Sequence, residues 1–287
     1  MSEAALRRGT HVEAAGSGAL AGAWLLPTIG GLWVRLSVCL FVLFFTVPVA
    51  VLLWRAAAGG SLLSGIRQPL VIHALLLTLI TTSISVLIAI VFGTPLAFAL
   101  ARRKFRGRQT LEVLLTLPLV LPPLVAGVAL LVAFGRRGLL GEPLDRAGIS
   151  LPFTTVAVVM AQLFVAAPFF VRAARIGFTA VSREMEEAAA MSGADPWHTF
   201  QRVILPLALP GVVSGVVLCA ARAFSEFGAT LMFAGNIEGR TQTMALAIET
   251  AIQTDLNSAL ALSLVLVVIA ALALTIPLLL LHGTETF

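Results

Sequence analysis

Charged side chains are scarce in this chain: Asp, Glu, Lys and Arg together make up 11% of its 287 residues. Average proteins carry about 25%. Apolar residues account for 59% of the sequence, and the mean hydropathy is +1.02. This composition lies far outside the range of soluble globular domains, so it predicts a protein that crosses a membrane several times.

Residues that bind metals or act as nucleophiles are also few. The two cysteines, Cys39 and Cys219, both fall in apolar stretches, so we expect them to pack as small residues rather than to form a disulfide or a metal site. The four histidines are dispersed, and the sequence has no glycine loop for phosphate and no nucleophile paired with a base. We therefore expect a non-catalytic chain without metal or cofactor. If it moves a solute uphill with ATP, another subunit must hydrolyse the ATP.

Six apolar windows are each long enough to cross a hydrocarbon core of about 30 Å as a helix. They lie at residues 33 to 54, 70 to 101, 111 to 134, 153 to 175, 207 to 234 and 257 to 281. The sequence therefore predicts an all-α, polytopic membrane protein with six transmembrane helices. The second window is longer than a span needs, so we expect that helix to tilt or to extend beyond the bilayer.

These windows divide the chain into three regions. Residues 1–32 mix Gly, Ala and Ser with scattered charges and lack the apolar core and cleavage site of a secretory signal, which predicts a loose cytoplasmic tail. Residues 33–69 hold the first span and an outer loop. Residues 70–282 hold the other five spans and a polar segment at about 178–206.

Basic residues predict the orientation of the spans. If the N-terminus is cytoplasmic, the inner segments hold twelve of them and the outer segments hold six. The cluster from Arg102 to Arg108 is the strongest anchor because it directly follows a span. Both termini are therefore expected in the cytoplasm. The pI near 10.8 does not indicate a nucleic-acid partner, because the basic residues lie at membrane boundaries rather than on a soluble basic face.

The segment at about 178–206 is polar, unlike the rest of the chain. Ser182 is placed to cap a helix that begins with glutamates, and Gly193 is suited to end that helix in a left-handed conformation. Asp195 is placed to cap a second short helix with Pro196 in its first turn. The pattern predicts a helix, a glycine turn and a second helix on the cytoplasmic side. A long solvated loop is the alternative.

The order of residues in this segment resembles the signature of binding-protein-dependent ABC transporter permeases of bacteria. Glu187-Ala188-Ala189 is followed after three residues by Gly193, and after nine more by Val203, then Leu205-Pro206. The family commonly has Ile where this chain has Val203. The resemblance implies a coupling helix that fits into a cleft on an ATPase subunit. The residues expected to make this contact are Glu187, Ala188, Ala189, Gly193, Asp195, Pro196, Trp197, Leu205 and Pro206.

The resemblance extends from about His73 to the end of the sixth span. The stretches from Gly93 to Arg103 and from Leu117 to Pro123 look like the second and third core spans of these permeases. Each alone is weak, because a membrane proline often only bends or ends a helix. Their order and separation together favour the family and the type I importer fold that it implies.

The fifth span resembles the molybdate branch of this family, a close relative of the sulfate permeases. The resemblance rests on the stretch from Arg222 to Asn236 and on Gly239 to Thr243, which favours molybdate over sulfate. The chain departs from that branch at Phe224-Ser225, where Leu-Gly is typical, and at Glu249, where Tyr is typical. Whether tungstate is also carried stays open.

The resemblance also implies partners and a working cycle. The expected assembly is a homodimer in the cell inner membrane, surrounded by lipid, with two ATP-binding ATPase subunits and a periplasmic or lipid-anchored molybdate-binding protein. Closure of the ATPases on ATP would draw the coupling helices together and turn the path outward, and hydrolysis would reset it.

Arg222 and Glu226 are ionisable residues four positions apart in an apolar span, so one helix face would carry both. One interpretation is an internal pair that locks the fifth helix against its neighbours. The other is that this face borders the translocation path, where a moderated arginine helps to balance an oxyanion that sheds water.

Two further regions leave alternatives open. The segment from 237 to 257 holds Met244 to Ile248, too short an apolar run to span a bilayer, which fits either a re-entrant or interfacial piece or a plain loop. Thr and Ser residues of the second span serve helix packing or line the path.

Two rival function classes have little support in the sequence. A secondary transporter is expected to show an internal repeat and several carboxylates in its spans, whereas Glu226 alone lies well inside one. A membrane enzyme would need clustered catalytic groups at one membrane face.

Overall fold

The computed structural model describes residues 28–58 and 69–282, and every regular element in these ranges is helical. The chain divides into two compact units, residues 1–55 and residues 56–287. Three predicted features lie outside the described residues: the tail up to residue 27, the loop at 59–68, and the C-terminal end at 283–287. The all-α prediction agrees with the described part of the chain.

The first unit ends at Arg55, within the helix α1 (Thr28–Ala58). The stretch Gly31–Arg55 of this helix is long and apolar enough to cross a membrane. The helix begins ahead of Trp33, the predicted start of the first span. Its described side chains are nearly all exposed, which suits a helix whose surroundings are lipid or another protein.

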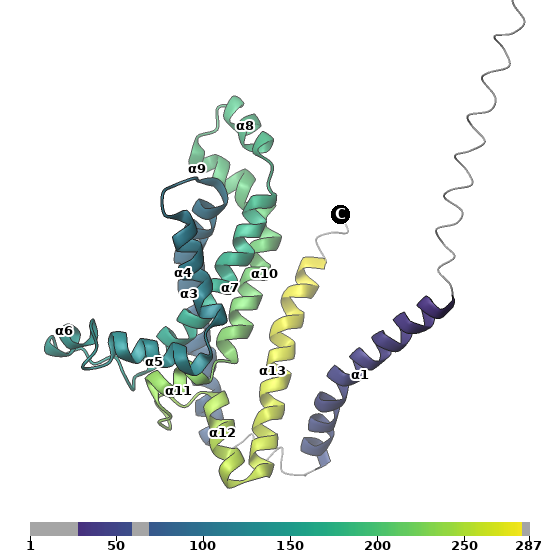
Figure 1. Cartoon of the computed structure of the whole chain (residues 1–287), viewed down its shortest axis with the longest axis vertical. Coiled ribbons are helices and arrows are strands. Elements are labelled where there is room, and N and C mark those ends of the chain that lie inside the picture. The colour runs from purple at the N-terminus through teal and green to yellow at the C-terminus, as the bar shows by residue number, and fades with distance from the viewer. Residues whose placement is uncertain (1–27, 59–68, 283–287) are drawn as a thin grey trace, which may run out of the picture. The chain divides into compact units, whose positions relative to one another are not determined.

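Three long helices of the second unit lie side by side in Figure 1: α3 (Pro69–Arg102), α7 (Thr155–Ala180) and α10 (Leu205–Phe224). α3 has 34 residues, so the prediction of a helix longer than one span is confirmed. The other elements are α4 (Arg108–Val120), α5 (Pro123–Phe134), α6 (Gly141–Arg146), α8 (Arg183–Met191), α9 (Pro196–Thr199), a π-helical turn η1 (Phe200–Ile204), α11 (Gly228–Ala234), α12 (Met244–Thr254) and α13 (Leu256–His282).

The third predicted span is broken rather than straight. The chain bends by 120° between α4 and α5, with Leu121 and Pro122 at the bend. Leu121 is extended, with φ −67° and ψ 134°, because a residue that precedes proline avoids the helical region. Pro123 then begins α5, where its missing N–H costs nothing. The window at 111–134 therefore encodes two helices with a sharp turn at the prolines.

The fifth predicted span is also interrupted. α10 ends at Phe224, and the next three residues separate it from the short helix α11. The helix also starts earlier than predicted, because α9, η1 and α10 form one continuous helical stretch, Pro196–Phe224, of 29 residues. The window at 207–234 thus covers the end of a long helix, a break and a second helix.

Four described helices are long and apolar enough to span a membrane, and the number is five if the bent α4–α5 pair forms one span. They are Gly31–Arg55, Pro69–Arg102, Thr155–Ala180 and Pro196–Phe224. α13 is also apolar, and its stretch Leu256–Leu272 is shorter than these four. The chain is therefore a multi-pass membrane protein.

The core of the second unit is built around α7, which packs against both α10 and α3. Phe170 and Phe178 are the largest fully buried side chains of α7, and most of their neighbours are small. Apolar helices gain little from burying more apolar surface away from lipid, so close packing between small residues holds them together.

Gly177 of α7 and Gly211 of α10 lie directly against each other in this core. A Cβ atom added to Gly211 would lie 2.5 Å from the Cα atom of Gly177, and one added to Gly177 would lie 2.8 Å from the backbone oxygen of Ala208. Both distances are shorter than real Cβ contacts, so only glycine fits at these two positions. The backbones of α7 and α10 therefore touch directly.

The predicted apolar piece at Met244–Ile248 begins the helix α12, which packs against α13 and α3. The backbone N–H of Met244 donates a hydrogen bond of 2.8 Å to Oγ1 of Thr78, which is fully buried. In α3, Ser85 donates 3.2 Å to the backbone oxygen of Val159. These contacts agree with a packing role for both hydroxyls, and Ser83 is exposed.

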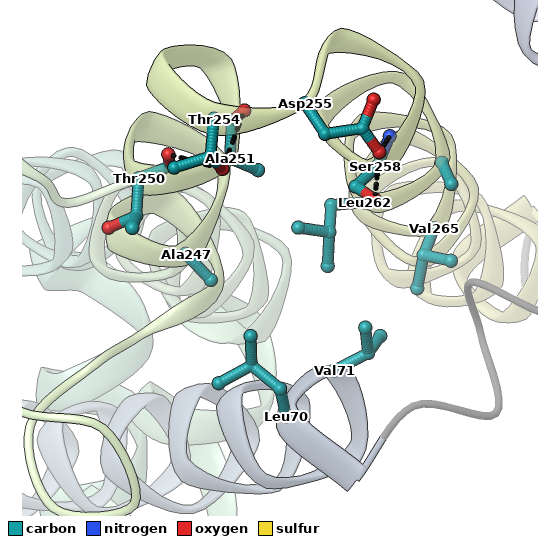
Figure 2. A pocket seen from close by; sticks show the side chains of 11 residues that line it. Leu70, Val71, Ala247, Thr250, Ala251, Thr254, Asp255, Ser258, Leu262 and Val265 are labelled. Atoms are coloured by element: carbon teal, nitrogen blue, oxygen red, sulfur yellow. Dashed lines mark hydrogen bonds between the residues drawn. The ribbon is translucent and has the colours of Figure 1, made fainter.

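A cavity of about 150 Å³ lies where α12, α13 and the start of α3 meet (Figure 2). Asp255 at its edge caps α13, because its carboxylate accepts hydrogen bonds from the backbone N–H groups of Asn257 and Ser258 and from the Ser258 hydroxyl. The Ser258 hydroxyl and these N–H groups hold the pKa of Asp255 below its usual value. The turn between α12 and α13 is thereby fixed by one side chain.

The glycine contact predicts a large effect of a small substitution. Gly211→Val should lower the free energy of unfolding by about 1–3 kcal/mol or more, because the added atoms force α7 and α10 apart. The measurement is thermal unfolding of the detergent-solubilised protein. Ser214→Val, at an exposed position of the same helix, is the control and should change little. Equal stability of the two variants would contradict the close contact.

Candidate coupling surface and path residues

The predicted coupling segment forms a hairpin at one end of the second unit, where α8 and α9 join α7 to α10 (Figure 1). α8 carries Glu184 and Glu186 in its first turn, as the helix dipole prefers, and no residue of α8 is buried. Ser182 occupies the N-cap position, but its side chain makes no capping hydrogen bond, contrary to prediction. α8 is thus a mostly exposed helix, in which Glu186 and Ala189 alone are partly buried.

Gly193 ends the turn after α8 in the left-handed region, with φ +83°. The backbone N–H of Gly193 bonds to the oxygen of Ala190 at 3.0 Å, and that of Ala194 bonds to the oxygen of Ala189 at 3.1 Å. These bonds satisfy the last carbonyls of α8, as expected of a glycine that terminates a helix. The predicted left-handed glycine is therefore confirmed.

Asp195 caps the following helix as predicted. One oxygen of its carboxylate accepts hydrogen bonds from the backbone N–H groups of Trp197 at 2.8 Å and His198 at 2.9 Å, and the other lies 2.6 Å from Nδ1 of His198. The backbone and side-chain bonds from His198 hold the pKa of Asp195 below its usual value. The carboxylate therefore stays charged, and the cap intact, throughout the neutral range.

The second short helix is not separate from the fifth span, contrary to prediction. α9 passes through the π turn η1 into α10, and the N–H of Leu205 bonds to the oxygen of Phe200, five residues earlier. Pro206 has no N–H to give to the carbonyl of Arg202, and a wider turn accommodates such a gap without ending the helix. Leu205 and Pro206 thus lie inside one continuous helix.

Aromatic rings connect this hairpin to the spans. Trp197 stacks on Phe200 with ring centres 5.8 Å apart, and Phe200 lies 5.1 Å from Phe98 of α3 and 6.2 Å from Phe178 of α7. Trp197 is the outer ring of this row, and it remains open to a partner because it is 62% exposed. A large exposed ring fixed from behind is suited to bind a partner protein.

An ion pair also holds α8 in place. Nη2 of Arg102, at the end of α3, lies 2.7 Å from a carboxylate oxygen of Glu186 and donates a hydrogen bond of 2.8 Å to the backbone oxygen of Val181. The sequence indicated Arg102 only as part of a topological anchor. Its second role, orienting the hairpin, depends on a contact between residues 84 positions apart, which no local pattern reveals.

Arg222 and Glu226 form the ion pair that their spacing predicted, with Nη2 of Arg222 2.6 Å from Oε2 of Glu226. Glu226 lies just beyond the end of α10, so the pair bridges the helix terminus rather than running along one helix face. Its Oε1 accepts a hydrogen bond of 2.8 Å from the N–H of Ala229 in α11. The buried Glu226 carboxylate therefore joins α10 to α11 across the break.

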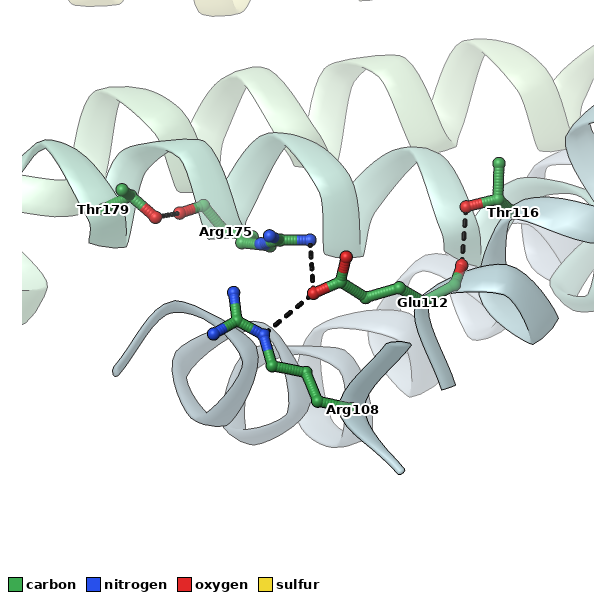
Figure 3. A network of polar contacts seen from close by, with 5 residues as sticks. All are labelled: Arg108, Glu112, Thr116, Arg175 and Thr179. Carbon is green, nitrogen blue, oxygen red and sulfur yellow. Dashed lines mark hydrogen bonds and ion pairs between the residues drawn. The ribbon is translucent and has the colours of Figure 1, made fainter. Parts of the chain in front are cut away.

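A second charged group lies on the side of α7 near the hairpin, and sequence reasoning missed it. Glu112 of α4 accepts hydrogen bonds from Nε of Arg108 at 2.9 Å and pairs with Nη1 of Arg175 at 3.2 Å (Figure 3). The two arginines were counted only as topological signals. The acid that brings them together is separated from Arg175 by 63 positions, so only the fold reveals the group.

The comparisons with known proteins agree with this architecture. The binding-protein-dependent transport system inner membrane component family matches residues 89–283. The chain belongs to this family. It is therefore a non-catalytic, multi-pass component of the inner membrane, and it works with a binding protein and an ATPase.

Two relatives show how similar the family members are. The molybdenum transport system permease protein ModB of Mycobacterium bovis is 44% identical over 235 residues, which cover 82% of this chain and 89% of that protein. The protein of the same name from Escherichia coli K12 is 44% identical over 183 residues, which cover 63% of this chain and 80% of that protein.

A solved structure supports the fold. A chain of a bacterial ABC transporter that imports the acidic polysaccharide alginate matches 95% of this chain and 97% of its own length with a TM-score of 0.68. The sequence identity is 17%, so this likeness concerns the fold alone.

The Glu226 contacts predict which substitutions the break between α10 and α11 tolerates. Glu226→Ala should lower the free energy of unfolding by about 1–3 kcal/mol, because it leaves the buried N–H of Ala229 without its acceptor and Arg222 without its ion-pair partner. Glu226→Gln should cost less, since the amide oxygen still accepts from Ala229. Unfolding in detergent measures both, with Glu238→Ala at an exposed loop position as the control. If Glu226→Ala proves as stable as the control, the carboxylate does not hold the break.

Proposed function

We propose that this chain is the permease subunit of an ATP-driven ABC importer for molybdate. The observation that carries the proposal is 44% identity, over most of the chain, to proteins named molybdenum transport system permeases. A sulfate or tungstate importer is the alternative. A secondary transporter is disfavoured by membership in a binding-protein-dependent family.

The coupling surface in this proposal is the α8–α9 hairpin. Glu187, Ala188 and Gly193 lie on its exposed side, and Trp197 presents an open ring. Ala189, Asp195, Pro196, Leu205 and Pro206 complete the set, by ending α8, capping α9 and continuing it into α10. An ATPase that grips the hairpin would move α7 and α10 together, because the hairpin connects those two helices.

The assembly in this proposal is a homodimer with two ATPase subunits and a periplasmic or lipid-anchored molybdate-binding protein. Each copy would have six spans, formed by α1, α3, the bent α4–α5 pair, α7, the α9–α10 helix and α13. Both termini would lie in the cytoplasm. Residues 1–32 form the tail, 33–69 the first span and its outer loop, and 70–282 the core.

The path in this proposal passes the break after α10. Arg222 is at the opposite end of α10 from Leu205, 17 residues away or about 26 Å along the helix. Its side chain is 23% exposed, whereas Glu226 is fully buried. A partly exposed arginine whose charge is partly balanced would attract an oxyanion without holding it tightly.

Transport measurements test the substrate. Proteoliposomes that contain this chain, its ATPase and its binding protein should take up molybdate only when ATP is present on the ATPase side. Excess tungstate should compete more strongly than excess sulfate, because the molybdate-binding protein selects the anion that it delivers to the permease. Uptake of sulfate in place of molybdate would overturn the substrate assignment, and uptake without ATP would overturn the importer.

A bulky substitution tests the coupling surface. Ala188→Trp should prevent co-isolation of the ATPase while leaving the permease folded, because Ala188 is exposed and the larger ring obstructs close docking. Ala147→Trp, at an exposed position after α6, is the matched control and should retain the ATPase. Normal ATPase recovery and ATP-dependent uptake with Ala188→Trp would contradict the assignment.

A further inference from the structure

Arginine side chains gather on one face of α7, close to the end that leads into α8. Arg172 and Thr179 are exposed and Arg175 is half-buried. Residues three and four positions apart lie on the same face of a helix, so these three side chains line one stripe. Three neighbouring hollows of about 600, 160 and 550 Å³ open along it, and Arg175 lines all of them.

The charges of this group do not balance. Arg108, Arg172 and Arg175 carry three positive charges, and Glu112 carries one negative charge. Among the described residues, Glu112 is the one carboxylate that pairs with them, and Arg172 has none within 4.0 Å. Two net positive charges therefore face the hollows.

The position of Arg172 favours hollows that are lined by water or polar groups over hollows that are filled by lipid. Arg172 lies eight residues before the end of α7 at Ala180, about 12 Å along the helix. An unpaired arginine that faces hydrocarbon is costly, and charged side chains in spans almost always face a bundle interior or a water-filled cavity. This face of α7 is therefore unsuited to lipid.

We infer that Arg172, Arg175 and Arg108 form an anion site for a tetrahedral, doubly charged oxyanion. The inference rests on the proposed function, and it places a resting point for the cargo near the ATPase end of the path, far from Arg222. The two net positive charges match the charge of such an anion. Glu112 orients Arg108 and Arg175 and weakens the attraction, so that the anion leaves again.

The test uses cysteine labelling. This chain is suited to it because two native cysteines are all that must be replaced first. Ile176 is exposed beside the arginines and lines the same hollow. Ile176→Cys is made in a Cys39→Ser, Cys219→Ala background and labelled in the assembled permease–ATPase complex. One thiol reagent carries a sulfonate, and a second reagent of similar size is neutral.

The anionic reagent should react faster than the neutral one, and millimolar molybdate should slow both. Adding Arg172→Gln should reduce the anionic rate by about fivefold, since a unit charge has been removed from nearby, and should abolish the protection by molybdate. Arg172→Lys should keep both effects. Lys104→Gln is the control, an exposed cation on the α3–α4 connection that lines none of the three hollows, and it should keep both effects as well.

Each contrary outcome overturns the anion site. A cysteine that reacts with neither reagent would show that the ATPase or a second permease copy covers this face. Reaction with the neutral reagent alone would show that the face contacts lipid. Equal protection by molybdate with and without Arg172 would place the anion elsewhere.

Sulfate separates the failure of this inference from the failure of the proposed function. Protection by sulfate but not by molybdate would keep the arginine site and overturn the molybdate assignment. ATP-dependent molybdate uptake with no protection by either anion would overturn the arginine site alone.

Discussion

The direct backbone contact between Gly177 and Gly211 is the constraint on which the rest of the structure depends. The α8–α9 hairpin begins where α7 ends and returns through η1 into α10. Because α7 and α10 touch through glycines, the two helices that carry the hairpin cannot slide past each other without a clash. The ring contacts of Phe98, Phe178 and Phe200 extend this rigid unit to α3. In the proposed coupling, a displacement of the hairpin would therefore be passed to three packed helices together.

Charges in the spans follow a second constraint, because hydrocarbon does not solvate them. Glu226 satisfies it inside the protein, with Arg222 on one oxygen and the N–H of Ala229 on the other. Arg108 and Arg175 satisfy it around Glu112. Arg172 has no such partner among the described residues. The first group shapes the chain at a helix break, and the second holds more positive than negative charge.

Proline and glycine shape this protein through different mechanisms. Prolines have two different effects on the helices. Pro122 and Pro123 lie at the 120° bend of the third predicted span, whereas Pro206 is accommodated by a π turn that keeps the fifth helix continuous. Glycines act at close contacts and turns, as Gly177 and Gly211 do between helices and Gly193 does after α8. The same residue type in a window of sequence thus has several structural outcomes.

The sequence alone determined the membrane class and the apolar helices, because these depend on composition and on apolar runs of about 20 residues. It also determined the Asp195 cap and the left-handed Gly193, because each depends on neighbours within about one helical turn. It likewise identified the ion pair of Arg222 and Glu226. The tertiary structure decided what these patterns left open: whether a proline ends, bends or widens a helix, that Glu226 bridges two helices, and that Glu112 and Arg102 have partners 63 and 84 positions away. Such contacts join residues that share no helix, so they exist only once α3, α4, α7 and α8 have packed together.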